Sequence, residues 1–136
     1  MNQITITTIG RDLAIPFIQD YAKRWCLPLD LEGSEKVWWW GAWDEHCLRG
    51  VVGFMRLPEM EDAFLVYGLY GDGTKNDKRA LCSLVRMLDS LPSDLYGAIH
   101  VKNEPWLRVA KRRGWTVQDW EQADRAHLVH RPKVSV

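Results

Sequence analysis

The stretch from Lys102 to Trp115 constrains the fold more than any other part of the sequence, because it predicts a short helix with both ends marked. Asn103 is a good N-cap, since its side-chain oxygen can accept an N–H that the first turn leaves unpaired. Cations in the last turn suit the negative helix end, and Gly114 suits the left-handed residue that closes a helix. Apolar runs at Leu95–Val101 and from Trp115 predict a strand on each side.

The remaining segments alternate between strand and helix patterns. Apolar residues at helical spacing predict one helix from Asp12 to about Trp25 and another from near Lys75 to Pro92, with Thr74 and Asp77 as a capping box. Gly68 inside a strand pattern indicates a bulge or a close approach. Leu27–Ser34 reads as a loop. Strands are predicted at Gln3–Ile9, Val37–Trp43, Cys47–Leu57, Ala63–Tyr70, Thr116–Trp120 and Ala126–His130.

Asn103 and the pair Gly114–Trp115 stand at the spacing of N-x-x-A-x-x-x-Y-x-x-x-G-F, the pattern of the GCN5-related N-acetyltransferases (GNAT). The chain resembles this family over nearly its whole length. The resemblance implies an α/β (α+β) fold with a mixed, mostly antiparallel sheet flanked by helices, in the order β-α-β-β-β-α-β-α-β-β. It also implies a single domain over residues 1–136. The segment alone fits equally well a capped helix of another α/β fold.

Composition argues against several classes of function, although a neutral balance still allows a local charged patch. The 136 residues carry 18 basic and 18 acidic side chains, and this neutral balance argues against general nucleic-acid binding. No apolar run is long enough to span a membrane, so we expect a cytoplasmic protein. Three cysteines without ligand spacing indicate buried free thiols. His127 and His130 would point to opposite faces of one strand, so we expect no metal site.

The turn after the fourth strand is the first candidate site, because a loop that leads into a helix N-terminus suits a phosphate. The GNAT resemblance implies that this turn holds the diphosphate of acetyl-CoA with the pattern Q/R-x-x-G-x-G/A. Lys75 stands at the first position and Ala80 at the last, but Lys78 replaces the middle glycine. A solvated basic helix start would look the same. The resemblance implies these cofactor-binding residues: Tyr67, Gly68, Leu69, Lys75, Lys78, Arg79, Ala80 and Asn103.

The catalytic acid is the second candidate. Many GNAT enzymes carry a tyrosine where this chain has Ala110, so the resemblance leaves the usual acid missing. Four residues on strands beside the expected acetyl group could replace it, namely Tyr96, His100, Tyr67 and Tyr70. Each also fits an ordinary strand position. The nearest carboxylates to serve as a base are Glu61 and Asp62, although a solvated acidic loop explains them as well.

Four tryptophans at Trp38, Trp39, Trp40 and Trp43 form an aromatic cluster in the second strand pattern. Alternation sends Trp38 and Trp40 to one face and the other two to the opposite face. Packing in the core accounts for this pattern, and an aromatic wall beside an acceptor site or a partner surface is the alternative.

The resemblance therefore implies transfer of an acetyl group from acetyl-CoA to a primary amine of a small molecule or a protein. Lys78 and Ala110 both depart from the usual pattern, which favours an alternative: a GNAT-like scaffold with little or no activity. Small GNAT-like proteins of tailed phages, some of them virion components, are similar in this respect. Whether the chain forms a homodimer is left open by the sequence. We expect neither a membrane nor a nucleic acid as partner.

Overall fold

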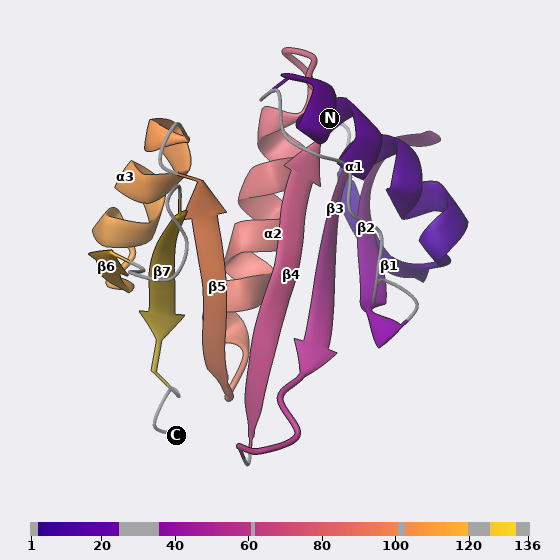
Figure 1. Ribbon diagram of the computed structural model, residues 1–136. Helices are drawn as coiled ribbons and strands as arrows, with labels where there is room; N and C mark the ends of the chain where they lie inside the picture. The colour runs from indigo at the N-terminus through magenta and orange to yellow at the C-terminus, as the bar shows by residue number, and fades with distance from the viewer. Residues whose placement is uncertain (1–2, 25–35, 61, 101–102, 120–125, 133–136) are drawn as a thin grey trace. The chain divides into compact units, whose positions relative to one another are not determined.

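A computed structural model describes residues 3–24, 36–60, 62–100, 103–119 and 126–132 of the chain. In this part of the chain, the elements follow the predicted order β-α-β-β-β-α-β-α-β-β (Figure 1). The strands are β1 (Ile4–Ile9), β2 (Trp38–Asp44), β3 (Cys47–Arg56), β4 (Ala63–Gly71), β5 (Asp94–His100), β6 (Thr116–Asp119) and β7 (Ala126–Arg131). The helices are α1 (Arg11–Arg24), α2 (Lys78–Ser90) and α3 (Glu104–Arg112). The predicted loop at Leu27–Ser34 lies outside the described residues.

The strands form one mixed sheet in the order β1-β2-β3-β4-β5-β7-β6. Strands β4 and β5 are parallel neighbours, with Ala63 opposite Asp94 and Leu65 opposite Tyr96. The β1–β2, β2–β3, β5–β7 and β6–β7 pairs are antiparallel. The predicted fold class, the central hairpin and the single predicted parallel pair are confirmed.

The chain divides into two compact units, and β4 contributes residues to both. One unit takes in the chain up to Met55 together with Tyr67–Ser90, and so holds α1, β1, β2, β3 except its last residue, α2 and the end of β4. The other takes in Arg56–Val66 and the chain from Leu91 onward. That residues 1–136 form a single domain stays a prediction.

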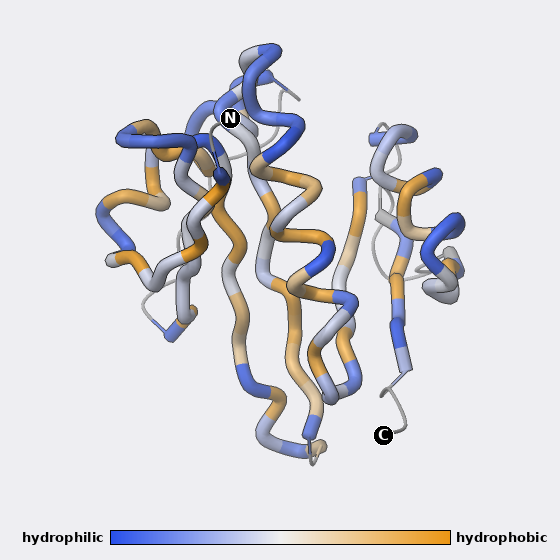
Figure 2. The backbone as a smooth tube through the Cα atoms, turned by 180° about the vertical axis from the view of Figure 1, so that it is seen from behind, coloured by the Kyte–Doolittle hydropathy of each residue, from blue (hydrophilic) through white to orange (hydrophobic). Residues whose placement is uncertain are grey.

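The core of the first unit joins α1 to the neighbouring strands. Ala14 and Ile18 of α1 pack with Trp39 and Val51. Trp39 is 3% exposed whereas Trp38 is 61% exposed, as the predicted alternation of β2 requires. Hydrophobic and hydrophilic residues alternate along the turns of α2 (Figure 2). Its buried residues are Ala80, Leu84, Val85 and Leu88.

The second unit is held by an apolar core and by one buried cation. Leu95 on β5, Leu107 on α3 and Val129 on β7 are buried. Arg131 at the end of β7 is also buried, and its guanidinium donates to the backbone oxygens of Leu91 and Ser93 at 2.8 and 2.7 Å. These bonds fix the chain immediately before β5.

Helix α3 ends as predicted but begins differently. Gly114 has φ +84°, its N–H donates to the oxygen of Lys111, and the N–H of Trp115 donates to Ala110. These two bonds form the Schellman motif that a left-handed glycine allows. At the other end, the buried Asn103 stands at the N-cap without a side-chain capping bond. The backbone N–H of Asn103 donates to the oxygen of His100 at 2.8 Å, and its backbone oxygen accepts the N–H of Leu107 at 3.2 Å.

Three further expectations need correction. Helix α1 begins at Arg11, so Asp12 lies in its first turn and not at its cap. Helix α2 begins at Lys78, three residues later than predicted. Cys47 and Cys82 are exposed free thiols and not buried ones, because one starts β3 at the hairpin turn and the other lies on the polar face of α2.

Candidate functional site

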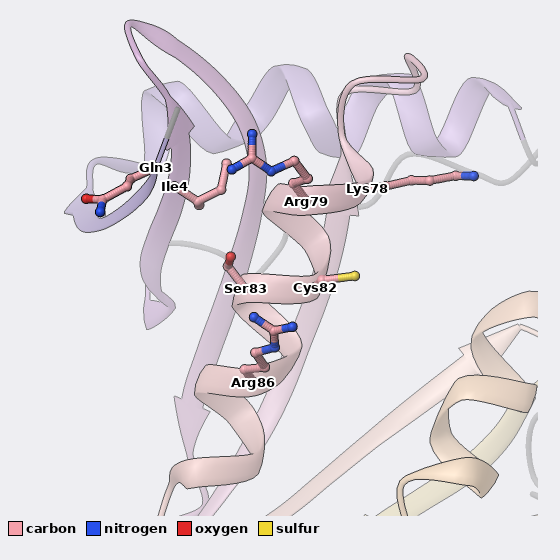
Figure 3. Close-up of a pocket in the computed structure, with 7 residues that line it drawn as sticks. All are labelled: Gln3, Ile4, Lys78, Arg79, Cys82, Ser83 and Arg86. Atoms are coloured by element: carbon pink, nitrogen blue, oxygen red, sulfur yellow. The ribbon is translucent and has the colours of Figure 1, made fainter. Parts of the chain in front are cut away.

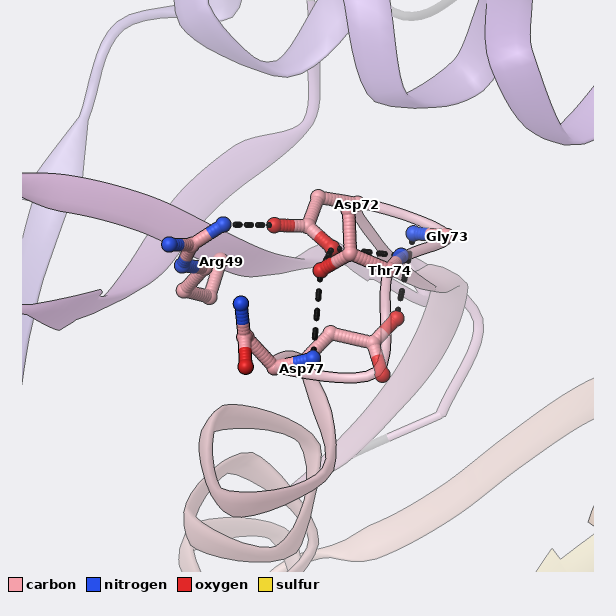
Figure 4. Close-up of polar contacts among 6 residues, drawn as sticks. Arg49, Asp72, Gly73, Thr74 and Asp77 are labelled. Atoms are coloured by element: carbon pink, nitrogen blue, oxygen red, sulfur yellow. Dashed lines mark hydrogen bonds and ion pairs between the residues drawn. The ribbon is translucent and has the colours of Figure 1, made fainter.

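The loop between β4 and α2 satisfies its own backbone donors with two aspartates (Figure 4). The N–H of Gly73 donates to the carboxylate of Asp77 at 3.1 Å, and the N–H of Thr74 donates to the carboxylate of Asp72 at 2.8 Å. The hydroxyl of Thr74 donates to the same Asp72 oxygen at 2.6 Å and accepts the N–H of Asn76 at 3.2 Å. Carboxylate and hydroxyl oxygens of the loop therefore accept three of its own N–H groups, those of Gly73, Thr74 and Asn76.

Asp77 also marks the start of α2. Its backbone oxygen accepts the N–H of Leu81 at 2.9 Å, which makes Asp77 the N-cap residue. The predicted capping box had assigned this place to Thr74, which instead lies within the loop. A Cβ at Gly71 would overlap the Asp77 carboxylate, so the glycine is required for the carboxylate to turn back over the loop.

Arg49 on β3 anchors this loop from outside. In the β2–β3 pair Ala42 lies opposite Gly50 and Trp43 opposite Leu48, so Arg49 is the extra residue of a β-bulge. Bulges re-aim side chains. The Arg49 guanidinium lies 2.9 Å from the Asp72 carboxylate, and the Arg49 oxygen accepts the N–H of Asp72 at 3.0 Å.

The pKa values of the two aspartates shift in opposite directions. For Asp72, burial opposes ionisation, but hydrogen bonds from Arg49 and Thr74 outweigh it and lower the pKa below its ordinary value. For Asp77, burial raises the pKa against the hydrogen bond from Gly73, and the charge of Asp72 raises it further. The loop thus holds one firmly ionised carboxylate and one whose charge is disfavoured.

The predicted cations at the start of α2 lie in the same unit as the loop but on different sides of the helix. Lys75 is exposed in the loop. Arg79 points toward the strand end that carries Gln3 and Ile4, whereas Lys78 points the other way (Figure 3). A shallow groove of about 520 Å³ lies along this part of α2. It is lined by Gln3, Ile4, Lys78, Arg79, Cys82, Ser83 and Arg86.

The end of β4 carries the predicted residues Tyr67, Gly68 and Leu69. Tyr67 meets Trp39 edge to face, with ring centroids 5.7 Å apart. A Cβ at Gly68 would overlap the ring of Tyr70, so the expected close approach comes from the chain's own tyrosine two residues later. Tyr70 also packs edge to face on Tyr21, and burial raises the pKa of its hydroxyl well above its ordinary value.

The other candidate residues, Tyr96, His100 and Asn103, belong to the second unit. Tyr96 stacks on the ring of His130, with centroids 4.3 Å apart and planes at 12°. The Nε2 of His130 is 3.1 Å from a carboxylate oxygen of Asp94. His100 is half-buried at the end of β5. The roles proposed for these residues stay predictions.

Sequence reasoning gave no role to Arg49, Asp72 or Asp94, and it considered His130 only as a metal ligand. A signal for Asp72 was present, because the run Asp72–Asp77 holds two acids and a threonine at turn spacing. The other three depend on which strands become neighbours.

Among the residues that the structure describes, no group of three or more histidine, cysteine or acidic side chains could hold a metal ion. No described helix is both long and apolar enough to span a membrane.

The sequence matches no protein-family model and no curated protein. Solved structures do match. An acetyltransferase of the GNAT family from Staphylococcus aureus Mu50 superposes with a TM-score of 0.71 at 15% identity, covering 94% of this chain and 99% of its own. Arabidopsis thaliana NAA60 in complex with acetyl-CoA superposes with a TM-score of 0.68 at 13% identity, covering 95% of this chain and 98% of its own. The IAA acetyltransferase from Bacillus cereus ATCC 14579 superposes with a TM-score of 0.71 at 9% identity, covering 97% of this chain and 100% of its own. The chain therefore has the fold of GNAT acetyltransferases.

Proposed function

We propose that the protein transfers an acetyl group from acetyl-CoA to a primary amine. The observation that carries this proposal is the arrangement of β4. Its parallel ladder with β5 covers only Ala63–Leu65, although β4 continues to Gly71. Backbone groups of Tyr67–Leu69 lie beyond that ladder, and they suit hydrogen bonds to the thioester and its pantetheine arm. The similarity to Arabidopsis thaliana NAA60, which was solved in complex with acetyl-CoA, supports the same donor.

The proposed reaction is a direct transfer. The neutral amine attacks the thioester carbonyl, the C–N bond forms, and the nitrogen loses a proton to solvent water. The C–S bond breaks, and the thiolate takes a proton. Ala110 has no proton to give, and its position is buried. Tyr96, His100 or Tyr67 would donate the proton, and such general acid catalysis contributes about 10²–10⁴-fold to a rate. Asn103 would contact the cofactor arm.

The test is acetyl-CoA turnover with a panel of amines, alongside a thermal-shift titration. A ligand at 100 times its Kd adds about 2.7 kcal/mol to the free energy of unfolding. We expect turnover to fall about 10²–10⁴-fold in one of Tyr96→Phe, His100→Gln and Tyr67→Phe. Each of these variants must keep the melting temperature of the parent protein. Absence of both binding and turnover would reject the proposal.

Two features favour a second function. One is Ala110, and the other is the β4–α2 loop, whose N–H groups donate to carboxylates of the same loop. Both features suit a scaffold that does not acetylate, such as a phage virion or accessory protein. This alternative predicts no stabilisation by acetyl-CoA and no gain of turnover in any variant.

A further inference from the structure

We infer that His130, held in place by Asp94, is the base that takes a proton from the acceptor amine. The inference rests on the proposed function, because it names a further catalytic residue for the same reaction. A primary amine such as a lysine side chain has a pKa of about 10.4, so fewer than about one molecule in a thousand is neutral at pH 7. The ammonium ion cannot attack a thioester until one proton has left its nitrogen.

The first support is the contact that fixes the His130 ring. Its Nε2 lies 3.1 Å from a carboxylate oxygen of Asp94, whose own backbone N–H donates to the oxygen of Asp62 at 2.9 Å. A carboxylate accepts hydrogen bonds and does not donate them, so Nε2 carries the hydrogen and Nδ1 keeps its lone pair. The same carboxylate stabilises the imidazolium that forms when Nδ1 takes a proton.

The second support is the availability of Nδ1. Among the residues that the structure describes, the polar and ring contacts of the His130 side chain are the one to Asp94 and the stack on Tyr96. The stacked rings lie 4.3 Å apart at 12°, so Tyr96 covers one face of the imidazole and opposes its rotation. The His130 side chain is still 32% exposed, so an amine can reach it directly or through a water molecule.

The third support is the position of the pair in the sheet. Tyr96 lies opposite Leu65, the last β4 residue of the parallel ladder, and opposite His130 on its other side. The histidine therefore stands one strand away from the point where β4 and β5 stop pairing. These residues all belong to the second compact unit. His127, three residues earlier on β7, lies on the opposite face of the strand and is not an alternative.

In the inferred reaction, Nδ1 of His130 takes one proton from the ammonium ion, and the neutral amine then attacks the thioester carbonyl. The nitrogen loses a second proton to water, the thiolate takes one proton, and the imidazolium returns its own to solvent, so each turnover releases one proton. An amine that is already neutral at pH 7, such as methoxyamine, does not need the first step. We therefore expect His130 to matter for alkylamines and not for methoxyamine.

The experiment compares kcat/KM for 2-phenylethylamine, which is protonated at pH 7, with kcat/KM for methoxyamine. We expect His130→Gln and Asp94→Asn each to lower the first value about 10²–10⁴-fold and to leave the second close to that of the parent. His46→Gln is the matched control, because it removes an exposed histidine from the hairpin turn of the other unit, and it should change neither value. Loss of the acid that protonates the thiolate would instead lower both values alike.

Nitrogen NMR of the histidine rings provides a second readout that needs no turnover. We expect neutral His130 to carry its hydrogen on Nε2 in the parent, and to shift toward the Nδ1–H form in Asp94→Asn, because an amide can donate to Nε2. A parent with the hydrogen on Nδ1 overturns the inference, as does the lack of a selective loss in folded variants of an active parent. If the parent acetylates neither amine, the proposed function fails and the inference is rejected with it.

Discussion

Asp72 and Asp77 accept N–H groups from adjacent residues of one loop, Thr74 and Gly73, yet their pKa values shift in opposite directions. At Asp77 burial raises the pKa, whereas at Asp72 the hydrogen bonds from Arg49, at 2.9 Å, and from Thr74 outweigh burial and lower it. One carboxylate thus stabilises the folded protein through its charge, whereas the charge of the other is a cost. The two opposite pKa shifts therefore predict opposite changes in folding stability with pH.

Asp72→Asn should lower stability at neutral pH by about 1–3 kcal/mol, the cost of losing hydrogen bonds to a charged group. Because the folded pKa of Asp72 lies below its ordinary value of 3.8, its contribution is present above that pH and is lost as pH falls through the folded pKa. The gap between parent and variant should therefore close in acid. Urea unfolding from pH 7 to pH 2.5 measures it, and a gap that is constant with pH would contradict the prediction.

Asp77→Asn should be at least as stable as the parent at pH 7. The folded pKa of Asp77 lies above its ordinary value of 3.8, so the folded protein gains stability as pH falls from above that folded pKa toward 3.8. The neutral variant lacks this dependence, and its advantage should shrink over the same window. Melting temperatures at pH 7, 5 and 4 test the sign. A variant that melts lower than the parent at pH 7 would show that the charge stabilises the fold.

Gly114→Ala should destabilise the protein by roughly 1–2 kcal/mol, because a left-handed residue with a Cβ is strained. No atom lies within 4 Å of the added methyl group, so the backbone conformation is the whole cause. Gly10→Ser is the control: the space there is also open, and serine suits the residue before α1. Chemical denaturation should leave this control unchanged or slightly more stable. Equal effects of the two changes would rule out the backbone explanation.

Ala110→Tyr should cost about 1–3 kcal/mol through overpacking, because Ala110 is only 7% exposed. Arg108→Tyr on the exposed side of the same helix should stay within about 0.5 kcal/mol of the parent. Restoring the usual tyrosine is therefore expected to cost stability before it can raise turnover. A variant with unchanged stability would mean that the helix face has room for the ring.

Leu84→Ala and Leu95→Ala each remove a fully buried side chain, one in each compact unit, and each should cost about 2–5 kcal/mol. Since β4 contributes to both units, we expect a single unfolding transition that both changes shift. Calorimetry tests this directly. Two separate transitions, with each variant moving only one, would divide the chain into independent domains.

The order of elements was predictable because it depends on local periodicity. The alternation of isoleucine and threonine marks β1, and helical spacing marks α2. Gly114 was predictable for the same reason, since only glycine adopts that conformation freely. The exact ends of helices were not predictable where they depend on tertiary neighbours. Thr74 and Asp77 are both good cap residues, and the choice between them is made by Gly73 and Asp72 in the folded loop.

Side-chain partners across the sheet were the least predictable part of the candidate site. Tyr96 and His130 are 34 positions apart, and they stack only because β7 inserts between β5 and β6. The exposure of Cys47 and Cys82 likewise depends on where the hairpin turns and which face α2 buries. Residue type alone favours burial for both.

The bulge at Arg49 limits how the length of this hairpin can change. Elsewhere in β2 and β3, the loss or gain of one residue would send buried side chains such as Trp39 to the opposite face. Loss of Arg49 itself would leave two regularly paired strands, so the sheet would tolerate that deletion best. The same deletion would remove the anchor of Asp72. A shortened hairpin in a related chain should therefore occur together with a different β4–α2 loop, and the two changes should be inherited as a pair.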